Sequence, residues 1–309
     1  MAIMSKPRFL FFSGKGGVGK TSMACATAVR EAQLGRKTLI VTTDPASNLA
    51  DVFETEIGHR ITPIPGVDNL WAMEIDPDLA TEEYKERVLG PMREAFPADV
   101  IAVLEEQLSS PCTSEIAAFD RFVKFMDDSE FDVVIFDTAP TGHTIRLLQL
   151  PVNWSDFIEL STSGSGQTCL GPVQAIQESK ALYDRAIARL HDPRVTTFVF
   201  VLHPDGIAIA ETERATHEIA LLGVKSLELI VNGILPEEVC EDPFFRARWE
   251  VQQHYLKEIA ARFCLPTRRM FLQDGEIKGV EQLKKIGLLL ENARSTSKSK
   301  RTPYERVSA

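Results

Sequence analysis

A glycine-rich segment near the amino terminus constrains this chain more than any other feature of its sequence. Residues 14–21 read Gly-Lys-Gly-Gly-Val-Gly-Lys-Thr and match the pattern G-x-x-x-x-G-K-[ST] in full. The segment stands between an apolar run, Arg8–Ser13, and a helical pattern that continues to about Gln33. A strand, a glycine-rich turn and a helix in this order predict a phosphate-binding loop, with a plain strand-to-helix turn as the alternative.

The residue types in this loop suit phosphate chemistry. Glycines let backbone N–H groups turn toward phosphate oxygens, and the start of the following helix adds partial positive charge. Lys20 is expected to reach the β and γ phosphates, and Thr21 to ligate Mg²⁺. Lys15 is an additional lysine, either a solvated surface residue or a group that acts on a nucleotide held by a partner subunit. The predicted nucleotide-binding residues are Gly14, Lys15, Gly16, Gly17, Val18, Gly19, Lys20, Thr21 and Ser22.

Two aspartates follow apolar runs that read as strands. Asp44 comes after Leu39–Thr43, and Asp137 closes Val133–Phe136. Because open α/β sheets bind ligands at the carboxyl ends of their strands, both aspartates are candidates to organise Mg²⁺ beside the loop. A helix-capping or turn aspartate is the alternative at each position.

Short apolar runs alternate with helical stretches through most of the chain. This pattern predicts an α/β fold with a mostly parallel sheet and helices on both faces. Two stretches, about 77–128 and 150–190, hold helical patterns and interrupt the alternation, so we expect helical insertions on one edge of a single domain, residues 1–291. The second insertion is expected to contain a helix from Pro172. Residues 292–309 are Ser-, Lys- and Arg-rich and predict a disordered basic tail. The expected strands are Arg8–Ser13, Lys37–Thr43, Leu70–Ile75, Asp132–Asp137, Thr197–Leu202, Leu227–Asn232 and Arg268–Leu272.

Composition narrows the classes of partner. The chain has 34 Lys and Arg against 44 Asp and Glu, a formal charge of −10, which argues against general binding to nucleic acid or anionic lipid. It contains neither a signal-peptide pattern nor an apolar run of about 18 residues, the least that spans a bilayer. Its 5 cysteines are widely spaced and fit free thiols in a reducing cytoplasm.

Three segments together resemble the arsenite pump-driving ATPase (ArsA) family of deviant-Walker P-loop ATPases. They are the loop with its extra lysine, Thr43–Asn48 (TDPASN) and Asp137–Pro151 (DTAPTGHTIRLLQLP). Cys112–Asp120 and Cys169–Pro172 resemble that family's two metalloid-cysteine segments. The likeness runs from about Arg8 to Leu290. It implies a P-loop NTPase fold and an ATP hydrolase that uses Mg²⁺ and delivers trivalent arsenic or antimony to a membrane efflux permease, at whose cytoplasmic side it would be peripheral.

The resemblance also assigns roles to residues. Lys15 would reach across a homodimer, and Asp44 would lie in a first switch that positions the attacking water. Asp137 to His143 would form a second switch, with His143 able to give a nitrogen or a hydrogen bond to the metalloid. The expected metalloid thiols are Cys112 and Cys169, and the expected adenine contacts are Asn232, Phe271 and Leu272. A metallochaperone is a possible further partner.

The cysteines can also be read from chemistry alone. Each is then most simply a small buried apolar residue, and Cys25 and Cys264 are expected in the core. Cys240 follows Pro236-Glu-Glu in an expected loop, where exposure is plausible. Cys112 lies at the start of an expected helix, Ser114–Met126, where a helix N-terminus favours thiolate.

The sequence departs from the family pattern in two respects. The family's chains often carry two such halves, whereas this chain has one and would need to dimerise. The related targeting ATPase of tail-anchored membrane proteins has a Cys-x-x-Cys before its Arg-Trp motif; here that stretch is Asp242–Trp249 without cysteine, so no zinc site is expected. That targeting function is the alternative, and a DNA- or membrane-binding partition ATPase is a more distant one.

Overall fold

The computed structural model describes residues 8–42, 49–93, 96–109, 111–127, 130–138, 167–168, 171–172, 182 and 184–293. One sheet organises these residues, with strand order β10-β9-β8-β1-β5-β2-β4-β3. Its strands are β1 (Phe9–Ser13), β2 (Thr38–Thr42), β3 (Thr62–Pro63), β4 (Leu70–Glu74), β5 (Val133–Asp137), β8 (Thr196–Leu202), β9 (Leu227–Ile234) and β10 (Thr267–Phe271). The helices are α1 (Lys20–Gln33), α2 (Leu49–Phe53), α3 (Pro77–Arg93), α4 (Ala98–Gln107), α5 (Pro111–Asp127), α8 (Gly206–Leu221), α9 (Pro243–Phe263) and α10 (Gly279–Asn292), with a 3₁₀ turn at Glu237–Val239.

The sheet confirms the predicted α/β class. Every pairing in it is parallel except β3 with β4, and all seven predicted strands are present within one or two residues of their expected bounds. The strand β3 was not predicted, because an antiparallel edge strand of 2 residues is too short to carry a period-two pattern.

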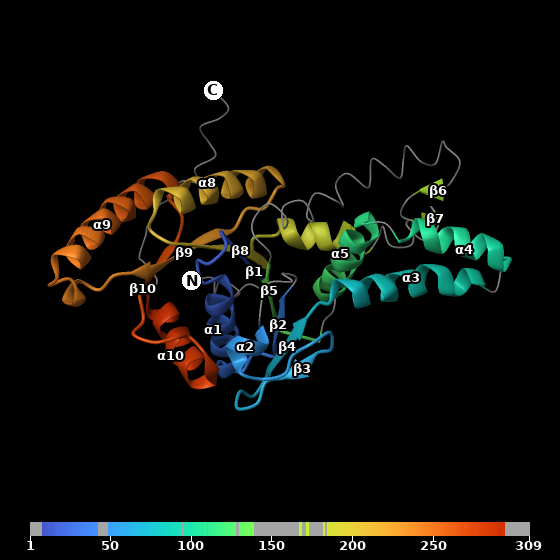
Figure 1. The fold of residues 1–309 in the computed structure, drawn as a ribbon, viewed down its shortest axis with the longest axis horizontal. Helices are drawn as coiled ribbons and strands as arrows, with labels where there is room; N and C mark the ends of the chain where they lie inside the picture. The colour runs from blue at the N-terminus through green and yellow to red at the C-terminus, as the bar shows by residue number, and fades with distance from the viewer. Residues whose placement is uncertain are drawn as a thin grey trace, which may run out of the picture.

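Helices cover both faces of the sheet (Figure 1). The side chains of β1 alternate between two cores: Leu10 and Phe12 pack with α1 and α10, whereas Phe9 and Phe11 pack with α5, α8 and α9. On the second face the Phe11 ring stacks 4.7 Å from Phe136 and 4.6 Å from Phe198, centroid to centroid. Each such pair adds about 0.5–1.5 kcal/mol beyond burial of its area. Neighbouring parallel strands are thereby locked at the centre of the sheet.

The first helical insertion is present as predicted. The helices α3, α4 and α5 follow one another without a strand between them and gather on one side of the molecule (Figure 1). Most of the second insertion lies outside the described residues. Its predicted helix from Pro172 is wrong at the first residue, because Gly171–Pro172 pairs antiparallel with Gln167–Thr168 in a short hairpin, β6 with β7. Of the predicted tail, residues 294–309 lie outside the description.

No helix in the described ranges is both long enough and apolar enough to cross a membrane.

Candidate phosphate-binding site

The glycine-rich loop joins the central strand β1 to the start of α1 at the carboxyl edge of the sheet. Gly19 stands at the N-cap position with φ 89°, and within the described residues no side chain caps the helix. The first turn of α1 also has no acidic residue. The partial positive charge of this helix end, with the N–H groups of its first turn, is therefore suited to an anion.

The glycines of the loop fall into two groups according to what surrounds them. A Cβ on Gly14 would lie 2.2 Å from the carbonyl oxygen of Val201 in β8, and a Cβ on Gly19 would lie 2.6 Å from Nδ2 of Asn232 in β9. These two glycines are required by the protein's own packing. Gly16 and Gly17 are exposed, and among the described residues a Cβ on either would meet nothing within 4 Å. Gly16 also lacks a positive φ, so neither its backbone conformation nor its described neighbours require glycine, and the position leaves room for close approach of a ligand.

A hydroxyl and a carboxylate meet directly beside the loop. The Thr21 Oγ1 donates to Oδ2 of Asp137 at 2.7 Å, across 116 residues of sequence. Strand register explains the meeting, because Asp137 in β5 pairs with Phe12 at the end of β1. Asp137 is almost completely buried, and Thr138 next to it donates to the carbonyl oxygen of Phe12 at 2.8 Å. A hydroxyl oxygen and a carboxylate are hard oxygen donors of the kind Mg²⁺ prefers, so the residues present fit this ion.

The two lysines of the loop differ in environment. Lys20 is buried, and its Nζ lies 3.5 Å from the backbone oxygen of Lys15, so its ammonium is folded back into the loop. Lys15 is half-buried, and its charge acts on His203 at the end of β8. The ammonium of Lys20 thus lies within its own loop, and the charge of Lys15 is close enough to act on His203; the predicted roles of both lysines in nucleotide chemistry stay predictions.

His203 is a site neighbour that the sequence analysis missed. Burial lowers the pKa of its imidazole; the Asp205 carboxylate opposes this shift and the Lys15 ammonium adds to it. His203 is therefore neutral at pH 7 and sets no positive charge against Lys15. Its position directly after the apolar run of β8 was the available signal, the same signal that identified Asp137.

The predicted adenine contacts lie on adjacent strands. Asn232 lies on β9 beside the loop, and its Nδ2 donates to the Val18 backbone oxygen at 2.9 Å, a tether that the sequence did not predict. Phe271 and Leu272, at the end of β10, are 53% and 55% exposed. Two apolar side chains are therefore exposed at the carboxyl end of β10, the strand next to the one that carries Asn232.

Three predicted site residues lie outside the described residues: Asp44, His143 and Cys169. The backbone of Cys112 occupies the second position of α5, but its side chain is not among those described. Their roles stay predictions. In the part of the chain that is described, no three His, Cys, Asp or Glu side chains are grouped as metal ligands.

The other cysteines correct two expectations. Cys25 is buried as predicted, and burial raises the pKa of its thiol well above the ordinary value, with the charge of Asp137 acting in the same direction. Cys240 was expected in a loop where exposure is plausible, but it is completely buried, and its thiol donates to the Pro236 oxygen at 3.1 Å. Cys264 was expected in the core but is exposed, because it ends α9 in a left-handed conformation with φ 48°.

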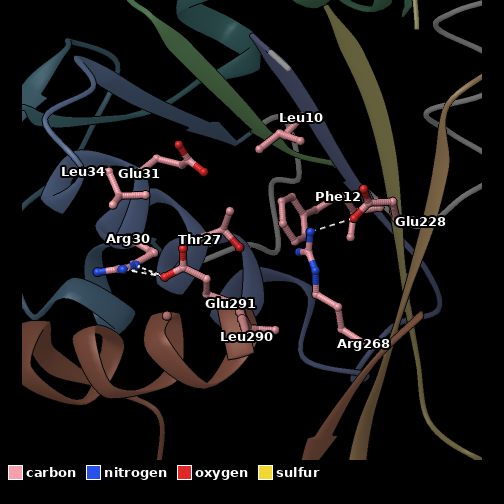
Figure 2. A pocket seen from close by; sticks show the side chains of 12 residues that line it. Leu10, Phe12, Thr27, Arg30, Glu31, Leu34, Glu228, Arg268, Leu290 and Glu291 are labelled. Atoms are coloured by element: carbon pink, nitrogen blue, oxygen red, sulfur yellow. Dashed lines mark hydrogen bonds and ion pairs between the residues drawn. The ribbon is translucent and has the colours of Figure 1, made fainter. Parts of the chain in front are cut away.

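A separate cavity of about 100 Å³ lies between α1, α10 and the sheet, away from the phosphate loop (Figure 2). Its charged side chains are all in ion pairs: Arg268 Nη2 lies 2.7 Å from Glu228 Oε2, Arg30 Nε donates to Glu291 Oε2 at 2.7 Å, and Glu31 Oε2 lies 2.8 Å from Nη1 of Arg36. These ion pairs account for the charges in the cavity without a ligand. The phosphate site is therefore the loop edge and not this cavity.

Comparison with known proteins agrees with this geometry. A family model described as anion-transporting ATPase (ArsA) matches residues 7–292. An arsenical pump-driving ATPase of Escherichia coli is 44% identical over 306 residues, 97% of this chain and 52% of that protein. A Halobacterium salinarum protein provisionally given the same name is 50% identical over 283 residues, 91% of this chain and 43% of that protein. The chain therefore spans about half the length of these two relatives. The ATPase GET3 of Candida glabrata is 32% identical over 93% of this chain and 90% of its own length.

Proposed function

The chain belongs to the anion-transporting ATPase family, and from this premise we propose that it hydrolyses ATP with Mg²⁺ to drive the export of trivalent arsenic or antimony. In this proposal a homodimer captures the metalloid and delivers it to a membrane efflux permease, at whose cytoplasmic side it works. The observation that carries the ATPase part is the open cradle at Gly16 and Gly17 beside the Thr21–Asp137 pair. The names of the arsenical pump relatives support the substrate.

The chain's own groups account for phosphate binding. The N–H groups of the loop and of the first turn of α1 donate to phosphate oxygens, and Lys20 supplies a compact positive charge from a buried position. Thr21 and Asp137 would hold Mg²⁺, which when bound neutralises charge on the phosphates. Asp44, from the end of β2, would orient the attacking water.

The role proposed for Lys15 requires a second subunit. The Lys20 ammonium lies within its own loop, and the Lys15 charge acts on His203, which follows β8. In the proposed dimer Lys15 stabilises charge on the partner's γ-phosphate in the transition state, the task of an arginine finger. Each of the two sites would then be incomplete in a monomer.

The proposed metalloid ligands are Cys112 and Cys169, with His143 beside them. Trivalent arsenic and antimony are soft centres that prefer thiolates. Cys112 lies in the first turn of α5, where the helix N-terminus favours the thiolate form. Thiols from both subunits would link metalloid binding to closure of the dimer, so that each ligand strengthens binding of the other.

Steady-state ATP hydrolysis by the reduced protein, with and without antimonite, tests the proposal. We expect antimonite to stimulate the wild type and to have no effect on Cys112→Ser or Cys169→Ser. Cys264→Ser is the matched control, because its thiol is exposed and lies on α9, and it should keep the stimulation. Lys20→Ala that hydrolyses ATP at the wild-type rate would refute the nucleotide assignment.

Mixing two inactive variants tests the dimer. Lys15→Ala keeps its own phosphate loop, and Lys20→Ala keeps the lysine that acts on a partner. A mixed dimer then has one complete site, so random pairing at equal amounts should restore about one quarter of wild-type activity. If Lys15 acts within its own subunit, mixing will restore none.

A second candidate is the targeting of tail-anchored membrane proteins. Its support is the similarity to GET3 and a set of exposed apolar side chains on the first insertion, Leu79, Phe96, Val100 and Val103. An apolar helical peptide that binds this surface and changes hydrolysis, in a protein indifferent to antimonite, would favour the second candidate.

A further inference from the structure

The strand that carries Asn232 is irregular at that point. Arg269 of β10 pairs with Val231 of β9, and Phe271 of β10 pairs with Ile234 of β9. Between these two pairs the chain advances by two residues on β10 but by three on β9. The strand β9 therefore has one extra residue, a β-bulge, at Asn232-Gly233. Gly233 has φ +71°, a left-handed conformation that glycine adopts at little cost. Bulges bend a strand and redirect a side chain.

The redirected side chain is that of Asn232. Its Nδ2 donates to the backbone oxygen of Val18 at 2.9 Å, and the absent Cβ of Gly19 leaves the space that this amide needs. The bulge thus fixes the phosphate loop from the side of β9.

One side chain of α9 holds the bulge in shape. The Nε2 of Gln252 donates to the Gly233 oxygen at 3.0 Å, and its Oε1 accepts from the Leu235 N–H at 2.8 Å. The donor and the acceptor of the Gln252 side-chain amide therefore both bond to backbone groups around the bulge. On the other side the bulge meets His203, whose Nε2 would lie 3.2 Å from a Cβ on Gly233.

We propose that Gln252 is a positioning residue of the nucleotide site, which holds the β9 bulge so that Asn232 is directed onto the phosphate loop. The inference rests on the proposed function, since it assumes that this loop binds nucleotide. The residue type is specific, because the position needs a donor and an acceptor together. A glutamate at this position would set a carboxylate oxygen, an acceptor, against the Gly233 oxygen, which is also an acceptor. A leucine would bond to neither the Gly233 oxygen nor the Leu235 N–H.

Binding of a fluorescent N-methylanthraniloyl-ADP with Mg²⁺ tests the proposal on the full chain. We expect Gln252→Leu and Asn232→Ala each to weaken binding roughly 3- to 10-fold, the effect of one lost neutral hydrogen bond. The double variant should bind no more weakly than Asn232→Ala alone, because Gln252 acts through Asn232. Gln253→Leu is the matched control; Gln253 makes no hydrogen bond to β9 among the residues described, and its variant should bind as the wild type does.

Three results would overturn the inference and are distinguishable. Wild-type protein that binds no nucleotide removes the proposed function and this inference with it. Binding by the wild type, with Gln252→Leu equally tight although less heat-stable, reduces Gln252 to a structural role and leaves the proposed function intact. Effects that multiply in the double variant show that Gln252 does not act through Asn232. Gln252→Glu repeats the test if the leucine variant fails to fold, with the same loss expected.

Discussion

Replacing single glycines of the loop by alanine should separate the demands of the fold from those of the ligand. At Gly14 an alanine Cβ would lie 2.2 Å from the Val201 oxygen, which is 0.8 Å short of the closest approach of about 3.0 Å. This oxygen belongs to the backbone of β8, which is hydrogen-bonded to β1 on one side and to β9 on the other. The oxygen therefore cannot move away from the added Cβ. At Gly16 the same Cβ meets no described residue within 4 Å.

The sizes of the two effects follow from these surroundings. Gly14 has φ +145°, which for alanine costs about 1–3 kcal/mol, and overpacking adds roughly another 1–3 kcal/mol. For a chain of 309 residues 1 kcal/mol shifts Tm by about 1.5 °C, so Gly14→Ala should melt about 3–9 °C below the wild type. Gly16→Ala should gain about 0.4–1 kcal/mol, because alanine loses less conformational freedom on folding.

Thermal unfolding without nucleotide measures the effect of each substitution on the fold. The same experiment with saturating MgADP measures its effect on nucleotide binding. A ligand at 100 times its Kd stabilises the native state by about 2.7 kcal/mol, so the wild type should melt several degrees higher with MgADP. Gly16→Ala should melt about 0.6–1.5 °C above the wild type without nucleotide and should lose the increase that MgADP gives. If Gly16→Ala instead binds MgADP normally, or destabilises the free protein as much as Gly14→Ala does, the division of the loop glycines is wrong.

Further predictions concern single side chains. Thr21→Val should lower the free energy of unfolding in guanidinium by about 1.5–3 kcal/mol, because its hydroxyl donates to a buried carboxylate, and Thr21→Ser should restore it. With the two proposed metalloid cysteines replaced by serine, a thiol reagent should label Cys264 in the native protein, and Cys25 and Cys240 only after unfolding. Burial raises the pKa of Tyr84 to about 12. Its contribution to stability is full below pH 10 and is lost between pH 10 and 12; the unfolding free energy of the wild type minus that of Tyr84→Phe should therefore fall by about 2–3 kcal/mol in this range.

The strands were predictable because the central ones are buried on both faces. Val133–Phe136 and Thr197–Leu202 are almost continuous apolar runs, and such runs bounded by polar residues leave few alternatives. The carboxyl end of each run then located Asp137, since parallel strands bring their ends to one edge. The two-residue strand Thr62–Pro63 had no such signal.

The two misplaced cysteines show where local sequence misleads. Cys264 lies between Phe263 and Leu265, apolar neighbours that favour burial, but the chain leaves α9 there and turns the thiol outward. Cys240 follows two glutamates that favour exposure, but the 3₁₀ turn carries those side chains outward and leaves the thiol beneath the loop. In both cases the direction of a turn decided burial, and the polarity of the neighbouring residues does not encode that direction.

The tether from Asn232 to the loop was also beyond the sequence analysis. An Asn-Gly pair inside an apolar run is a signal for a bulge, but the pair does not say which partner the redirected amide will meet. That partner depends on the order of the strands, which places β8 between β1 and β9. Because the contact between Asn232 and the loop passes across β8, it can be recognised only once the order of strands in the sheet is known.

The position of α5 bears on how a metalloid bound at its first turn would act on the phosphate loop. The Phe122 ring lies 4.4 Å from Phe136 and 5.2 Å from Phe11, centroid to centroid. Phe136 directly precedes Asp137, and the strand of Phe11 leads into the loop. Interiors packed this closely transmit displacement and do not absorb it, and β1 and β5 are each paired on both sides. Cys112 lies ten residues from Phe122, about 15 Å along the helix. Under the proposed function, Phe122 is therefore the contact through which a movement of α5 would reach both the strand that ends at Asp137 and the strand that leads into the loop.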